Sequence, residues 1–225
     1  MVEPLSVALR TETSQAHQDA EGSAFIEQLM GGAACQHAFA ALVAQQLVIY
    51  RALEDVLHAD YADHPMVAPV LDHRLDRVAA LERDMAQLFG SDHDVRLAAG
   101  QIRICRATTE YATVLRTQHS PEMMLANHYV RYLGDLSGGQ VIARLVERNY
   151  GISPAALNFY RFDGIPKPKP YKDAYRDRLD AIELDPTQRR AVIDAAVTSF
   201  ELNRRVFADL GAAREPEHTA AGVAR

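Results

Sequence analysis

Three glycines interrupt a segment that otherwise has the pattern of one long helix, between Ser120 and Gly151. Ser120 is a typical N-cap, Pro121 suits the first helical position, and Gly151 is placed to end the helix. A glycine inside a helix costs about 1 kcal/mol relative to alanine, so three of them close together require a reason. We predict a helix over residues 121–150 that carries a bare patch near its middle.

The patch is formed by Gly134, Gly138 and Gly139, with Asp135 at its edge. Gly134 and Gly138 are four residues apart, so they share one helix face, and Gly139 lies beside them. Because glycine has no Cβ, this face lets a flat group approach the main chain closely.

Three interpretations of the patch compete. Small residues four apart are typical of a close crossing between two helices, but such a crossing gives Asp135 no role. Residues 136–140 spell LSGGQ, the signature pentapeptide of ABC-transporter ATPases, yet the chain lacks the phosphate-cradling loop that this motif requires. The third interpretation is a kinked helix that lies over a flat cofactor, with Asp135 handling bound water.

The run from His128 to Gln140, HYVRYLGDLSGGQ, resembles the distal-helix signature of the heme oxygenases. The resemblance extends, in the family's order, over Leu5–Phe25, Asn158–Phe162, Tyr171–Arg178 and Ser199–Leu210. It implies an all-α, multi-helical domain in which heme is sandwiched between a proximal helix and the kinked, glycine-rich distal helix.

The periodicity of the whole chain agrees with an all-α fold, since strand signals are scarce. Amphipathic patterns cover residues 5–30, 35–59, 66–89, 95–117, 121–150, 171–182 and 186–210. With 225 residues, 48% of them hydrophobic, the chain can bury one core, and we predict a single domain over residues 1–210. Residues 211–225 have the composition of a disordered tail. Ile165–Pro170 alternates proline with lysine and predicts an extended strap.

The resemblance places His17 at the family's proximal iron ligand. A ligating imidazole needs an acceptor for its second nitrogen, and Glu21, one turn later on the same face, can supply it directly or through water. An ordinary solvated carboxylate is an equally good interpretation of Glu21.

The resemblance also places cations where the two propionates of heme b would lie. Arg10, Lys172 and Arg176 match the family's basic positions, and Lys172 and Arg176 share a helix face. Tyr129 can add a hydroxyl hydrogen bond at this edge, and Arg131 is a further candidate partner. The alternative is a solvated basic face.

The implied reaction uses heme as both cofactor and substrate. O2 and electrons from an external donor convert heme, in three successive oxygenations, to biliverdin of the α isomer, carbon monoxide and ferrous iron. In this scheme Asp135 orients water that delivers a proton, and the three glycines lie against the heme. Phe200 and Phe207 match the family's last helix, and we expect them in the core first and in the heme wall second.

The sequence also limits location and partners. No apolar run of about 18 residues and no signal peptide is present, which predicts a cytoplasmic protein without a membrane anchor. The net charge of −6 does not favour nucleic-acid binding. Without a nucleotide-binding glycine motif, the electrons must come from a separate ferredoxin or flavoprotein reductase, which we expect to dock near Lys167, Lys169 and Lys172. Cys35 and Cys105 are expected to be isolated, buried thiols.

Three other functions compete with heme cleavage. A heme carrier on the same scaffold would keep His17 and the basic edge without needing Asp135. A carboxylate di-iron protein requires paired E-x-x-H motifs, and the chain offers only Glu215 with His218, in the predicted tail. A thiamin-degrading relative would depend on a nucleophilic cysteine, and neither cysteine lies in a recognisable site.

Overall fold

Helices account for every regular element of residues 3–213, the part of the chain that the computed structural model describes. The helices are α1 (Leu5–Glu12), α2 (Ser14–Glu21), α3 (Ala24–Gly31), α4 (Gln36–Asp60), α5 (Val78–Phe89), α6 (His93–Ala98), α7 (Arg106–Thr117), α8 (Pro121–Tyr150), α9 (Pro168–Asp180) and α10 (Pro186–Ala212). Short 3-10 turns are η1 (Ala68–Val70), η2 (His73–Leu75), η3 (Pro154–Ala156) and η4 (Asn158–Tyr160). The predicted all-α class is confirmed.

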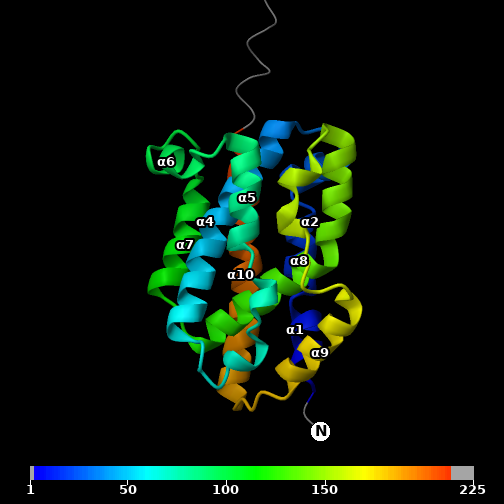
Figure 1. Ribbon diagram of the computed structural model, residues 1–225. Coiled ribbons are helices and arrows are strands. Elements are labelled where there is room, and N and C mark those ends of the chain that lie inside the picture. Colours follow the sequence, from blue (N-terminus) through cyan, green and yellow to red (C-terminus); the bar gives the residue numbers. More distant parts are fainter. Residues whose placement is uncertain (1–2, 214–225) are drawn as a thin grey trace, which may run out of the picture.

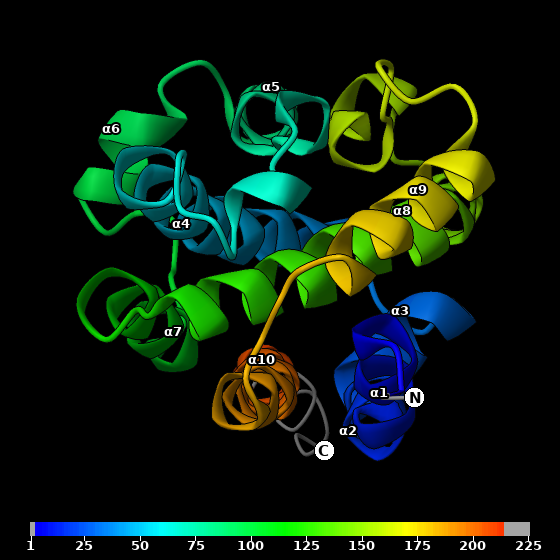
Figure 2. The ribbon, with the colours of Figure 1, turned by 90° about the horizontal axis from the view of Figure 1, so that it is seen from below.

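The long helix α8 crosses the molecule between two groups of helices (Figure 2). On one side α4 packs against α8, α5 and α7; on the other, α10 packs against α8 and against α1, α2 and α3. The first half of α8 runs obliquely and its second half rises along the edge of the molecule (Figure 1). The helix therefore changes direction part-way along its length.

Both ends of α8 form as their sequence predicts. The hydroxyl of Ser120 accepts a hydrogen bond from the backbone N–H of Met123 (3.3 Å), and Pro121 occupies the first turn. Gly151 ends the helix in the left-handed conformation, with φ at 64°, which costs a residue without Cβ little.

Some predicted patterns are broken into shorter helices. The pattern over residues 5–30 is three helices, because a turn at Thr13 separates α1 from α2 and the chain leaves helical geometry at Gly22 and Ser23. The pattern over 66–89 becomes helical only from Val78, after η1 and η2. The pattern over 95–117 is interrupted after α6, where Gly100 adopts a φ of 69°.

Two predicted boundaries also need correction. The extended strap predicted over residues 165–170 ends early, because α9 begins at Pro168; prolines are tolerated in a first turn, whose N–H groups have no helical acceptor. The last helix continues to Ala212, so residues 211 and 212 are helical rather than part of the predicted tail. The rest of that tail, with Glu215 and His218, lies outside the described residues.

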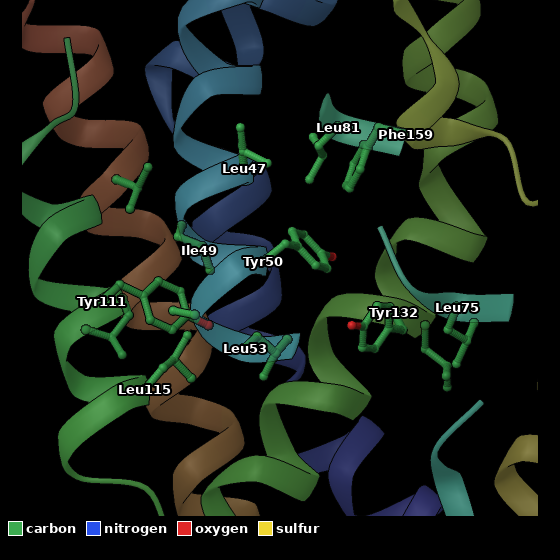
Figure 3. Close-up of a cluster of buried hydrophobic side chains, with 14 of the residues drawn as sticks. Leu47, Ile49, Tyr50, Leu53, Leu75, Leu81, Tyr111, Leu115, Tyr132 and Phe159 are labelled. Carbon is green, nitrogen blue, oxygen red and sulfur yellow. The ribbon is translucent and has the colours of Figure 1, made fainter. Parts of the chain in front are cut away.

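Buried aliphatic and aromatic residues, several tyrosines among them, fill the space between α4 and its neighbours (Figure 3). Because buried hydroxyls require partners, these side chains also connect the helices. Tyr111 of α7 donates to Asn127 of α8 (2.6 Å) and lies 2.8 Å from the hydroxyl of Ser199 of α10. Tyr132 of α8 donates to Glu54 of α4 (3.2 Å).

Cys105 is buried as expected, but Cys35 is exposed, because it precedes the first turn of α4 at the surface. Among the described helices, none has a stretch long and apolar enough to cross a bilayer.

Candidate active site

Two of the three glycines of α8 present bare backbone to open space. A Cβ atom added at Gly134 or Gly138 would meet no atom within 4 Å. Gly139 differs from the prediction, because it is buried and a Cβ there would lie 3.0 Å from Cδ1 of Tyr160 in η4. The backbone patch open to a ligand is therefore formed by Gly134 and Gly138, whereas Gly139 allows η4 to pack closely on α8.

Asp135 lies beside this patch and is held from α4. The hydroxyl of Tyr50 donates a hydrogen bond to Oδ2 of Asp135. Burial raises the pKa of Asp135 to about 6, although the positive charge of Arg131, the Tyr50 hydrogen bond and the charge of Arg77 act in the opposite direction. A carboxyl group with this pKa can both hold and release a proton near neutral pH.

The side chain of Arg131 lies beside the pair of Tyr50 and Asp135. It is buried, donates to Oε1 of Gln46, and places its guanidinium 4.5 Å from the ring centroid of Tyr50. A second ring, that of Tyr111, lies 5.6 Å away. Arg131 thus faces α4 and α7 next to Asp135, so the suggestion that it binds a propionate at the open edge is wrong.

On α2, His17 is arranged as a metal ligand would be. Its side chain is 48% exposed, and its Nδ1 lies 3.4 Å from Oε2 of Glu21. The ring of Phe200, from α10, meets the imidazole edge-on with centroids 5.4 Å apart. A carboxylate at one ring nitrogen orients the imidazole and leaves Nε2 as the nitrogen for a metal. The predicted pairing of His17 with Glu21 is present.

The N-terminal helix α1 is fastened to α9. The backbone N–H and the hydroxyl of Ser6 each donate to the carboxylate of Asp180, both at 2.7 Å. This double hydrogen bond fixes the two helices that carry the predicted propionate partners.

Basic residues from α1 and α9 lie near Tyr129 and Ser137 of α8. Burial raises the pKa of Tyr129, and the positive charges of Arg176 and Arg10 oppose this rise, so both cations lie near the phenol. Nζ of Lys172 donates to Oγ of Ser137 on α8 (3.0 Å), one residue before Gly138. Cations from α1 and α9 therefore lie beside the exposed side of α8, where the sequence predicts the cationic edge.

The two phenylalanines of α10 have different surroundings. Phe200 is half-buried and touches His17. Phe207 is buried and stacks on Phe25 of α3, with centroids 6.3 Å apart. Phe207 belongs to the core, which leaves Phe200 as the residue suited to a ligand wall.

Tyr50 is a site residue that the sequence analysis did not identify. It lies within the apolar pattern of α4, where it has the appearance of an ordinary core residue, and it projects from α4 toward α8 (Figure 3). The available signal was its hydroxyl, since a buried tyrosine usually finds a hydrogen-bond partner.

Together these residues fit a flat, dianionic iron macrocycle. The bare backbone of α8 offers one face, His17 offers a nitrogen ligand, and Arg10, Lys172 and Arg176 offer positive charge at one edge. This is the set of groups that heme with two propionates requires.

Comparison with known proteins agrees with this chemistry. The family model described as heme oxygenase matches residues 3–209. The chain is 34% identical over 210 residues to the heme oxygenase of Takifugu rubripes, covering 92% of this chain and 74% of the relative. It is 30% identical over 209 residues to heme oxygenase 1 of Synechocystis, covering 92% and 84%. The crystal structure of Synechocystis heme oxygenase-1 in complex with heme superposes with a TM-score of 0.87 at 27% identity and covers 94% of each chain.

Proposed function

The chain belongs to the heme oxygenase family, and we propose that it cleaves heme b with O2 and externally supplied electrons to biliverdin, carbon monoxide and ferrous iron. The observation that carries this proposal is the half-buried Asp135, held by Tyr50 beside the bare backbone of Gly134 and Gly138. A protein that only stores heme has no need of a proton-holding carboxyl group at that place.

Heme supplies the iron that activates O2 and is itself the molecule that is cleaved. The imidazole of His17 holds the iron from the proximal side, and Glu21 orients the ring. Gly134 and Gly138 let the distal helix lie close to the porphyrin, which excludes bulk water from that face.

Proton delivery is the task of Asp135. Its Oδ2 accepts the Tyr50 hydrogen bond, so Oδ1 is the atom from which a proton passes to ordered water. Because the pKa of Asp135 is raised to about 6, the group is a weak acid rather than a strong one at the distal face. A weak acid that acts through water promotes cleavage of the O–O bond less than a strong acid in direct contact with the oxygen would.

The cationic edge fixes the rotation of heme about its own axis. Arg10, Lys172 and Arg176 pair with the propionates, and this pairing determines which meso carbon faces the distal helix. We propose the α isomer of biliverdin as the product, on the basis of the match between these three cations and the family's pattern.

An absorption time course with hemin, a reductant, O2 and catalase tests the proposal. The Soret band should disappear while a broad red biliverdin band appears. Asp135→Ala should bind hemin normally but lose about 100-fold or more in biliverdin formation, the usual contribution of a positioned acid–base group. Asp63→Ala, at an exposed aspartate, is the matched control and should turn over normally. A Soret band that persists in the wild type indicates a heme carrier.

The iron ligand is tested separately. His17→Ala should lose the histidine-ligated heme spectrum, and added imidazole should restore it. His37→Ala, at an exposed histidine of α4, should leave the spectrum unchanged. A normal spectrum in His17→Ala would assign the iron to another residue.

For the electron donor, we propose an acidic ferredoxin or flavoprotein reductase that docks at the start of α9. All three lysines of the chain lie in this segment, at positions 167, 169 and 172. Lys167 is exposed and Lys169 pairs only with Asp173 at 3.0 Å. Reversing both charges should slow turnover with an acidic ferredoxin at low ionic strength and leave turnover with a chemical reductant unchanged. Equal rates with ferredoxin would place the docking surface elsewhere.

A further inference from the structure

Two histidines and an aspartate, one from α4 and two from the segment around η2, meet at the C-terminal end of α4. Nε2 of His58, in the last turn of α4, lies 3.2 Å from Oδ1 of Asp76. Nδ1 of His73, the first residue of η2, lies 2.8 Å from Oδ2 of the same carboxylate. The two imidazole rings stack with centroids 4.8 Å apart, and one ligand atom of each residue lies within 4.8 Å of the others.

The segment that carries His73 and Asp76 is held firmly against α4. Arg77, the next residue, is buried, and its backbone N–H donates to Oε1 of Glu54 at 2.5 Å. Glu54 precedes His58 by one helical turn, so both lie on the same face of α4. Ligand atoms on a rigid frame need little rearrangement to enclose an ion.

The side chain of Arg77 also fixes the segment that carries His73 and Asp76. Its guanidinium donates to the carbonyl oxygens of Leu75 (2.7 Å), Phe159 (3.2 Å) and Arg161 (2.8 Å). The loop of His73 is thereby tied to η4 as well as to α4.

The cluster is accessible from solvent on one side. The His73 side chain is 85% exposed, whereas those of His58 and Asp76 are 34% and 29% exposed. An ion bound here would have protein ligands on its inner side and room for water on its outer side. Two imidazole nitrogens, a carboxylate oxygen and water form a normal coordination shell of Zn²⁺ and related ions.

We propose that His58, His73 and Asp76 form a binding site for one divalent transition-metal ion of the zinc type. The ion replaces the two histidine–carboxylate hydrogen bonds with metal–ligand bonds and cross-links the end of α4 to η2. This site is separate from the iron ligand His17, which lies on α2. Tyr50, which holds Asp135, precedes His58 by eight residues on α4, so the backbone positions of these two residues are about 12 Å apart along that helix.

Titration of the heme-free full-length protein with Zn²⁺, followed by calorimetry, tests the site. The wild type should bind one Zn²⁺ at this site, and His73→Ala should weaken that binding by at least about tenfold. His73 is exposed, so its removal leaves the fold intact. His37→Ala, at an exposed histidine near the start of α4, is the matched control and should bind Zn²⁺ as the wild type does.

A second titration distinguishes Zn²⁺ binding at this site from Zn²⁺ binding at His17. His17 and Glu21 form another histidine–carboxylate pair, so the experiment is repeated in His17→Ala, which should retain the His73-dependent event. Co²⁺ in place of Zn²⁺ should give visible absorption bands that His73→Ala and Asp76→Asn abolish. The proposal is overturned if no Zn²⁺ binds, or if binding is equal in the wild type and His73→Ala, which would leave the cluster as a hydrogen-bonded surface group only.

Discussion

Replacing Gly138 with alanine should stabilise the heme-free protein and weaken heme binding at the same time. A Cβ at this position meets no protein atom within 4 Å, so alanine adds no clash. Alanine is favoured over glycine inside a helix by about 1 kcal/mol, which raises the melting temperature of a domain of this size by roughly 2–4 °C. The stability gain follows from the backbone alone.

The same methyl group occupies the surface on which the porphyrin lies. Moving a flat ring away from the helix by about 1 Å forfeits up to about half of the dispersion energy across that face. We therefore expect Gly138→Ala to bind hemin at least about tenfold more weakly, which corresponds to about 1.4 kcal/mol. Urea unfolding of the heme-free protein and a Soret titration with hemin measure the two effects.

Gly139→Ala is the matched control, because it lies one residue further along the same helix. Its Cβ would lie 3.0 Å from Cδ1 of Tyr160, and overpacking of this kind costs about 1–3 kcal/mol. This cost offsets or exceeds the gain of about 1 kcal/mol that alanine brings inside a helix, so Gly139→Ala should not show the stabilisation expected of Gly138→Ala. A Gly138→Ala variant that is less stable than the wild type without heme, or that binds hemin as tightly as the wild type, would show that Gly138 does not lie open to the porphyrin.

Three further predictions concern buried and edge residues. Tyr50→Phe removes a hydrogen bond that favours ionised Asp135, so the pKa in the pH profile of heme cleavage should rise by about 1–2 units; an unmoved profile would remove Asp135 from the titrating step. Burial raises the pKa of Glu54 to about 7, so its contribution to stability is present below pH 4.5 and is lost as the pH rises through 7. Glu54→Gln should therefore gain about 3 kcal/mol over the wild type between pH 4.5 and 8 in urea unfolding, and equal pH slopes would contradict this. Reversing the charges of Lys172 and Arg176 should change the biliverdin isomer, resolved by chromatography; an unchanged isomer would mean that apolar contacts orient heme.

The ends of a helix could be predicted from the sequence where capping residues lie within one turn of them. The limits of α8 follow from Ser120, Pro121 and Gly151, whose preferences act within one turn. The breaks at Thr13 and Ser23 were missed, because the apolar periodicity continues across α1, α2 and α3 even though the backbone does not.

Tertiary partners could not be predicted in the same way. The partner of Tyr50 is Asp135, 85 residues further along the chain, and only the packing of α4 on α8 brings them together. Gly139 has the same residue type as its neighbours on the patch, yet the position of Tyr160 gives it a different role. The direction of Arg131 likewise depends on Gln46, which no local pattern connects to it. The pairing of His17 with Glu21 was predictable, because helical spacing alone determines it.

The most direct test of ring cleavage is the carbon monoxide released per heme consumed, measured together with ferrous iron and biliverdin in the presence of catalase. Enzymatic cleavage should release one carbon monoxide, one ferrous ion and one biliverdin for each heme that disappears. Loss of the Soret band without carbon monoxide would mean that heme is destroyed by peroxide, and this result would rule out the proposed oxygenase activity.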